Sequence, residues 1–133
     1  MIGLCCINLI LLIMYTFSFE RLDVWIKSRV LTGKIYELTQ NFPETERFGI
    51  VSQLRRAVIS VCSNIAEGSS RNSKREQAHF YRIAFSSLME TLNHLIISLD
   101  LYYLDSRILT ELRNDIHTIS LMLNRLNNYA NRK

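Results

Sequence analysis

The chain has 133 residues, of which 48% are apolar, and its formal net charge is +4. This length is enough for one domain with its own core and too short for two. The chain has one proline and four glycines, which disfavours an all-β fold, because such a fold uses these residues in its many turns. A net charge this small does not imply a nucleic-acid partner by itself, so the distribution of charge matters more.

Residues 1–17, MIGLCCINLILLIMYTF, carry no charge and are strongly apolar. A secretory signal has Lys or Arg before its apolar run and a small-residue cleavage site after it, and neither is present. A spanning helix needs about 20 apolar residues, whereas this run is shorter and is interrupted by Asn8. A signal, a membrane anchor and an upstream extension remain open. We favour an extension, with translation starting at Met14.

Three cysteines occur, Cys5, Cys6 and Cys62, with no CxxC or Cys/His spacing of the kind that binds zinc. Adjacent cysteines rarely pair with each other. We interpret all three as reduced thiols, which predicts a cytoplasmic protein.

The apolar spacing is helical from residue 18 onward. In the first predicted helix, apolar residues recur three, four or six apart: Trp25, Leu31, Ile35, Leu38 and Phe42. Pro43 ends it, because proline disfavours helix in the preceding residue and cannot continue the hydrogen-bond ladder. The second helix has a stripe with spacings of three and four: Val51, Leu54, Val58, Val61 and Ile65.

The third helix has a longer stripe: Phe80, Ala84, Leu88, Thr91, Leu92, Leu95, Leu99 and Tyr102. Asp105 is a good N-cap for the fourth, whose stripe is Ile108, Leu112, Ile116, Ile119, Leu123 and Leu126. Helices of about 20 to 30 residues with short links predict an all-α, antiparallel up-down four-helix bundle, which we place over residues 18–131.

The stretch SNIAEGSSRNSKREQ, residues 63–77, joins the second and third helices. Gly68 is suited to a left-handed position just past the end of a helix. Ser73 and Glu76 fit a capping box, in which each side chain accepts a hydrogen bond from the other residue's backbone N–H. We therefore interpret GSSRN, residues 68–72, as a short link between two helices with both ends specified.

No motif for catalysis, metal binding or a cofactor is found. The link has one glycine and follows no strand, which excludes a P-loop. Glu76 and His79 form one ExxH pair, but a di-metal bundle needs two. Glu90 and His94 are spaced to pair on one helix face, and Cys62 has no His/Asp partners. The sequence predicts a protein that is not an enzyme and has no cofactor.

Positive charge is concentrated in one part of the chain. Residues 47–75 hold six Lys and Arg against one acidic residue, a net +5, whereas residues 76–104 hold one Arg against three acidic residues, a net −2. A basic helix face can neutralise phosphates without reading sequence. The alternative is a solvated face that aids solubility.

Three segments, FERLDVWIKSR at 19–29, FPETERFGIVSQLRRAVISVCSNIAEGSSRNSKREQAHFYRIAFSSLMET at 42–91 and ISLMLNRL at 119–126, resemble the four-helix-bundle family named after the 23S ribosomal RNA intervening sequence. The resemblance covers about residues 18–128. The most specific motifs are VW-x-K, FG-x-x-SQ-x-RRA and SNIAEG.

The resemblance implies a homopentamer whose subunits form a barrel around a central channel. It also implies a relation to the accessory protein of diversity-generating retroelements, which binds RNA and DNA through a basic surface and partners a reverse transcriptase. No member of the family looks like an enzyme.

Carried over by position, the family's basic residues become our candidates for phosphate contact: Lys27, Arg29, Arg55, Arg56, Arg71, Lys74 and Arg75. Ser63, Asn64, Glu67 and Gly68 are structural motif residues, and Asn64 is expected to bond to a neighbouring helix or subunit. The family typically has proline where Cys62 stands, so this chain need not share the kink that proline imposes.

We conclude from the sequence that the chain binds RNA or DNA nonspecifically through a basic face formed by the second helix and the link. An alternative is a structural or adaptor protein whose partner is another protein. A third possibility, a membrane-anchored bundle, depends entirely on residues 1–17.

Overall fold

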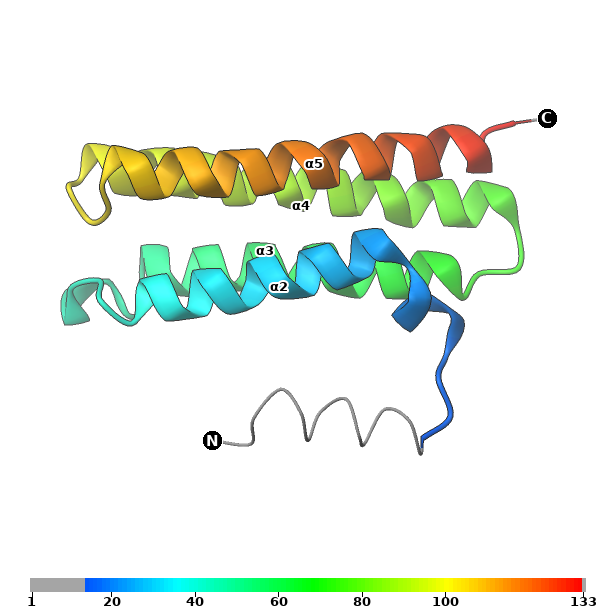
Figure 1. The fold of residues 1–133 in the computed structure, drawn as a ribbon, viewed down its shortest axis with the longest axis horizontal. Helices are drawn as coiled ribbons and strands as arrows, with labels where there is room; N and C mark the ends of the chain where they lie inside the picture. Colours follow the sequence, from blue (N-terminus) through cyan, green and yellow to red (C-terminus); the bar gives the residue numbers. More distant parts are fainter. Residues whose placement is uncertain (1–13, 133) are drawn as a thin grey trace.

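A computed structural model describes residues 14–132 (Figure 1). Within this range lie four α-helices and no strand: α2 (Asp23–Thr39), α3 (Ile50–Ser69), α4 (Lys74–Asp100) and α5 (Ser106–Ala130). Short 3₁₀ turns, η1 (Ser18–Arg21) and η2 (Glu44–Glu46), precede α2 and α3. Consecutive helices run antiparallel (Figure 1). The all-α four-helix prediction is confirmed.

All four helices contribute to one core. The predicted stripe of α3 is confirmed, since Val51, Leu54, Val58, Val61 and Ile65 are all buried. The stripe predicted for α4 was wrong at two positions. Tyr81 is buried whereas its neighbour Phe80 is only half-buried, and Tyr102 lies beyond the end of the helix at Asp100 and is exposed. Adjacent helix residues point about 100° apart: Tyr81 packs inward with Ala78 and Ala130, and Phe80 lies at the edge of the packed face.

Two predicted N-caps are present. The Ser73 hydroxyl accepts a hydrogen bond from the Glu76 backbone N–H at 3.1 Å, and the Asp105 carboxylate accepts one from the Ile108 N–H at 2.9 Å. The capping box predicted for Ser73 and Glu76 forms only in part. The bond from the Glu76 N–H to the Ser73 hydroxyl is present, but in residues 14–132 no bond joins the Ser73 N–H to the Glu76 carboxylate. These caps fix where α4 and α5 begin.

The predicted role of Gly68 was wrong. The helix α3 continues through it to Ser69, and none of the described glycines has a positive φ. Gly68 is buried, and a Cβ built on it would lie 2.7 Å from Tyr81 Cε1 and 3.0 Å from Phe80 Cβ. This glycine therefore allows a close approach of α4 to α3.

The described helices include none with both the length and the apolar character required to cross a membrane. Our expectations for residues 1–13 lie outside the described part of the chain. Of the remaining leader, Met14, Tyr15 and Phe17 are exposed.

Candidate nucleic-acid interface

The antiparallel topology separates the predicted basic residues into two groups. Arg55 and Arg56 lie in the second turn of α3, whereas Arg71 follows the end of that helix. At a rise of 1.5 Å per residue, about 20 Å of helix separates the two groups. The expected continuous basic face is therefore not formed.

Contacts between helices show which segments lie together. Thr32 of α2 contacts Cys62 of α3, Ser60 of α3 bonds to Ser87 of α4, and Lys74 of α4 lies over Tyr129 of α5. These pairs align the start of α2, the end of α3, the start of α4 and the end of α5 in one half of the bundle. The links α2–α3 and α4–α5 lie in the other half (Figure 1).

The two halves differ in charge. We define the basic half as residues 18–29, 63–86 and 119–132, and the acidic half as residues 30–62 and 87–118. The basic half holds nine Lys and Arg against four Asp and Glu, a net +5. The acidic half holds six against eight, a net −2. Charge is thus segregated along the bundle axis, which the sequence windows did not show.

Arg55 lies in the acidic half and is engaged by α2. Its Nε donates to Thr39 Oγ1 at 2.9 Å, its Nη2 donates to the Tyr36 carbonyl at 3.4 Å, and its Cζ lies 4.4 Å from the centroid of the Tyr36 ring. These contacts hold α3 against α2. Arg56, one residue on, is exposed, so the structure does not bring these two arginines to one site.

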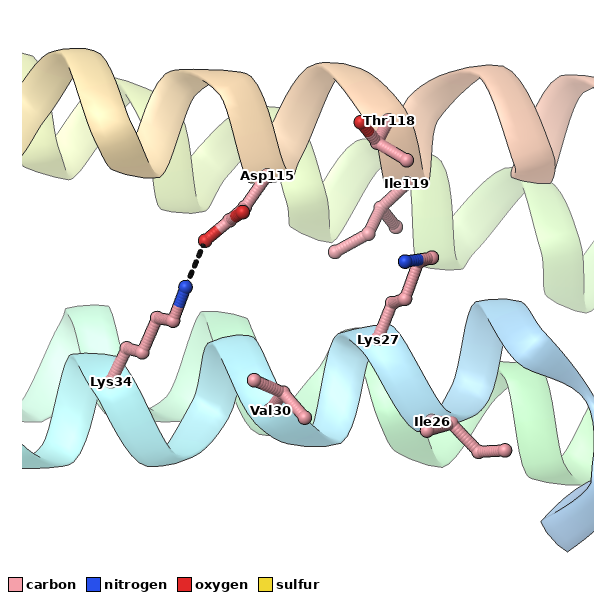
Figure 2. A pocket seen from close by; sticks show the side chains of 7 residues that line it. All are labelled: Ile26, Lys27, Val30, Lys34, Asp115, Thr118 and Ile119. Carbon is pink, nitrogen blue, oxygen red and sulfur yellow. Dashed lines mark hydrogen bonds and ion pairs between the residues drawn. The ribbon is translucent and has the colours of Figure 1, made fainter.

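Lys27 and Arg29 both lie in the basic half, but their side chains lie against different residues. Lys27 lines a groove of about 360 Å³ between α2 and α5, and Figure 2 shows its side chain reaching toward Ile119 of α5. Arg29 lies 5.6 Å over the Trp25 ring. Residues two apart on a helix do not share a face, so these two cations act separately.

Arg71, Lys74 and Arg75 are gathered where α4 begins, and all three are exposed. Arg71 lies 4.7 Å from the Phe80 ring centroid, and Lys74 lies 5.2 Å from that of Tyr129. Aromatic rings attract cations over their faces, so these two side chains are held in place.

A hollow of about 420 Å³ opens beside these residues, lined by Arg71, Arg75, Glu76, His79, Phe80 and Arg82. The sequence reasoning missed Arg82, because it lies outside the basic window and in a stretch of net negative charge. The spacing of Arg75, His79 and Arg82, four and then three residues, could have shown that they share one face of α4.

We expected Asn64 to bond to a neighbouring helix or subunit, and within the described part of this chain no direct bond to a neighbouring helix is among its contacts. A bond to another subunit stays a prediction. The Asn64 Nδ2 donates to the Ser60 carbonyl at 2.8 Å and to Ser60 Oγ at 3.0 Å, within the same helix. Ser60 Oγ is in turn 2.8 Å from Ser87 Oγ of α4. Asn64 thus supports the α3–α4 contact indirectly. Ser63 and Glu67 are exposed.

Cys62 lies inside the unbroken helix α3, half-buried, with its Sγ 3.5 Å from Thr32 Oγ1. Burial raises the pKa of its thiol, against smaller opposing effects of the Thr32 hydrogen bond and the Arg29 charge. In the described residues no three His, Cys, Asp or Glu side chains gather as metal ligands would. The predicted pair of Glu90 and His94 is present at 3.3 Å.

Comparison with known proteins agrees with this architecture. Residues 20–125 match the family described as 23S rRNA-intervening sequence protein. A crystal structure from Bacteroides thetaiotaomicron VPI-5482, described as a protein with unknown function from the S23 ribosomal protein family, superposes with a TM-score of 0.73. It is 22% identical, and the match covers 79% of this chain and 95% of that one, which shows the shared fold. A search of curated proteins gave no match. Since the family match spans most of its length, the chain belongs to the 23S rRNA-intervening sequence protein family.

Proposed function

We propose that this chain is a non-enzymatic, cytoplasmic protein that binds RNA or DNA nonspecifically through its basic half. The observation that carries the proposal is the segregation of charge, with a net +5 in the basic half and −2 in the acidic half. A duplex or a strand carries a dense row of phosphates, so a surface of this kind attracts it whatever its sequence.

The cations of the basic half are also available. Among residues 14–132, the ion pairs of lysine or arginine are Lys34 with Asp115 and Arg47 with Glu44, and both lie in the acidic half. The nine cations of the basic half therefore have no carboxylate partner within 4.0 Å in the described chain. Phosphate binding there would not require an internal ion pair to break.

Fluorescence anisotropy with labelled RNA and DNA, titrated against salt, tests this proposal. Changing Lys74 and Arg125 of the basic half to Ala together should flatten the slope of log K against log salt by about 2 for a duplex. The matched control changes Arg107 and Arg113 of the acidic half to Ala, with the same loss of charge and an unchanged slope. Absence of binding by the wild-type protein at low salt would refute the proposal.

We further propose that the chain assembles as the homopentamer that its family resemblance implies. Apolar side chains on the outer helix faces support self-association, among them Val30, which is 55% exposed. Five copies would place five basic halves on one particle and strengthen binding through multivalency. Light scattering measures the particle mass, and the mass of a monomer would contradict the assembly.

A second candidate function is an adaptor that contacts a protein, for which a reverse transcriptase is the partner that the resemblance suggests. It is favoured by Phe48 and Tyr102, which are 88% and 94% exposed in the two links of the acidic half. Aromatic residues are enriched where proteins meet. A pull-down that captures one protein with the wild type and loses it with F48S/Y102S would support this role.

A further inference from the structure

The hollow beside the start of α4 combines cations with aromatic rings. Arg71, Arg75 and Arg82 face it together with a single carboxylate, Glu76, which leaves a local net charge of +2. None of the three arginines forms an ion pair in the described chain. The volume of about 420 Å³ is within the range of small-ligand sites. The hollow can therefore hold an anionic group of nucleotide size.

Arg71, one of the cations that line the hollow, has a planar guanidinium that is held against an aromatic ring. The Arg71 guanidinium lies 4.7 Å from the Phe80 ring centroid, and the His79 ring meets the Phe80 ring edge-on, with centroids 5.5 Å apart. A guanidinium is planar, carries its N–H donors in that plane and stacks on aromatic faces, and the Arg71 side chain is exposed to solvent. A guanidinium that is exposed in this way can serve as a platform on which a flat base stacks.

The position of this platform is fixed by the fold. Phe80 lies against Gly68, where a Cβ would come within 3.0 Å of the Phe80 Cβ. The Arg71 backbone is held from both sides: its N–H donates to the Gly68 carbonyl at 3.2 Å, and its carbonyl accepts from Gln77 Nε2 at 3.0 Å. The glycine of SNIAEG thus helps to place the Arg71–Phe80 pair, a role that the sequence motif alone did not indicate.

We propose that this hollow holds one unpaired nucleotide of a single-stranded nucleic acid. The base stacks on the Arg71 guanidinium, and Arg75 and Arg82 bind the phosphates of the strand. Glu76 repels phosphate, which directs the backbone toward the other two arginines. Bases within a duplex are covered on both faces by their neighbours, so only an unpaired base can use the platform. The inference rests on the proposed function and adds a preference for single strands.

The test measures binding of a strand of about twelve nucleotides, alone and annealed to its complement, at one salt concentration. The key variant is R71K, which keeps the charge and removes the planar guanidinium. We expect R71K to weaken binding of the single strand about fivefold or more and to leave duplex binding unchanged. R125K, in the same basic half and outside the hollow, is the matched control and should change neither. A second variant, R75A/R82A, should weaken binding of both forms through lost phosphate contacts.

The outcomes separate the two proposals. If R71K weakens single strand and duplex equally, or behaves as R125K does, the inference is overturned and nonspecific binding through the basic half stands. If the wild type binds neither form at low salt, both proposals fail. Far-ultraviolet circular dichroism of each variant checks that the bundle is intact, as expected for exposed positions.

Discussion

Arg55 of α3 is hydrogen-bonded to Thr39 of α2, with 2.9 Å between Nε and Oγ1. Thr39 is buried and its hydroxyl also donates to the Ile35 carbonyl, while the Arg55 guanidinium covers the Tyr36 ring. A half-buried arginine with these partners stabilises the packing of two helices. It is poorly placed to bind phosphate, although its motif, QLRRA, suggested that role.

We predict that R55A lowers the free energy of unfolding by about 1–3 kcal/mol, because it removes a charge-assisted hydrogen bond and a cation–π contact. The neighbouring R56A is the matched control: Arg56 is exposed, and surface changes of this kind stay within about 0.5 kcal/mol. Urea unfolding followed by circular dichroism measures both. Equal stability of the two variants would contradict a structural role for Arg55.

A second prediction concerns Gly68. In G68A the new methyl group would lie 2.7 Å from Tyr81 Cε1 and 3.0 Å from Phe80 Cβ, so the buried Tyr81 ring or the two helices must shift. Overpacking of this kind costs about 1–3 kcal/mol, which a shift in the urea midpoint would report.

Gly33 of α2 provides the control for that substitution. It is exposed within the helix, and a Cβ there would meet nothing within 4 Å. G33A should therefore stabilise the protein by about 0.5–1 kcal/mol, since alanine loses less conformational freedom in a helix than glycine does. If G68A were equally stabilising, the close approach of α3 and α4 at Gly68 would not be real.

These positions show which parts of the fold follow from the sequence. The stripe of α3 and the caps at Ser73 and Asp105 depend on residues close together in the chain, and the sequence predicted them correctly. The role of Gly68 depends on Tyr81 of the next helix. Spacing within one helix cannot show such a contact, and a glycine near the end of a helical stripe predicts helix termination, its common local use.

The candidate site was predicted less completely for a related reason. A window along the chain counted Arg55 and Arg71 together, but the length of α3 separates them. The same window excluded Arg82, which lines the hollow with Arg71. The charge on a surface depends on which distant segments the antiparallel packing brings together. The family resemblance named candidate residues but did not show which side chains surround them.

A third prediction concerns the reactivity of Cys62. Burial raises the pKa of its thiol above the ordinary value of 9.0, so little thiolate forms near neutral pH. The substitutions C5S and C6S leave Cys62 as the one cysteine. At pH 8, iodoacetamide should modify Cys62 more slowly than it modifies the thiol of free glutathione, because the thiolate is the nucleophile. The rate should reach that of a free thiol in denaturant. Rapid labelling of the folded protein at pH 7 would contradict this.

The same shift affects stability at high pH. A folded-state pKa above the unfolded value means that the folded protein favours the protonated thiol. The contribution of the Cys62 thiol to the free energy of unfolding is fully present below the pKa of the unfolded state. It is lost as the pH rises through the raised pKa of the folded state. The C62A variant should therefore lose less stability than the wild type between pH 8 and alkaline pH, when both are measured by urea unfolding.

The last prediction concerns Lys34 and Asp115, which close one end of the groove between α2 and α5 (Figure 2). Their Nζ and Oδ2 atoms are 2.7 Å apart, yet the side chains are 50% and 38% exposed. Water and salt screen such a pair, so a double-mutant cycle with K34A and D115A should give a coupling of about 0.2–1 kcal/mol. The coupling should fall further at high salt. A coupling of several kcal/mol that salt does not change would mean that the groove is closed to water in solution.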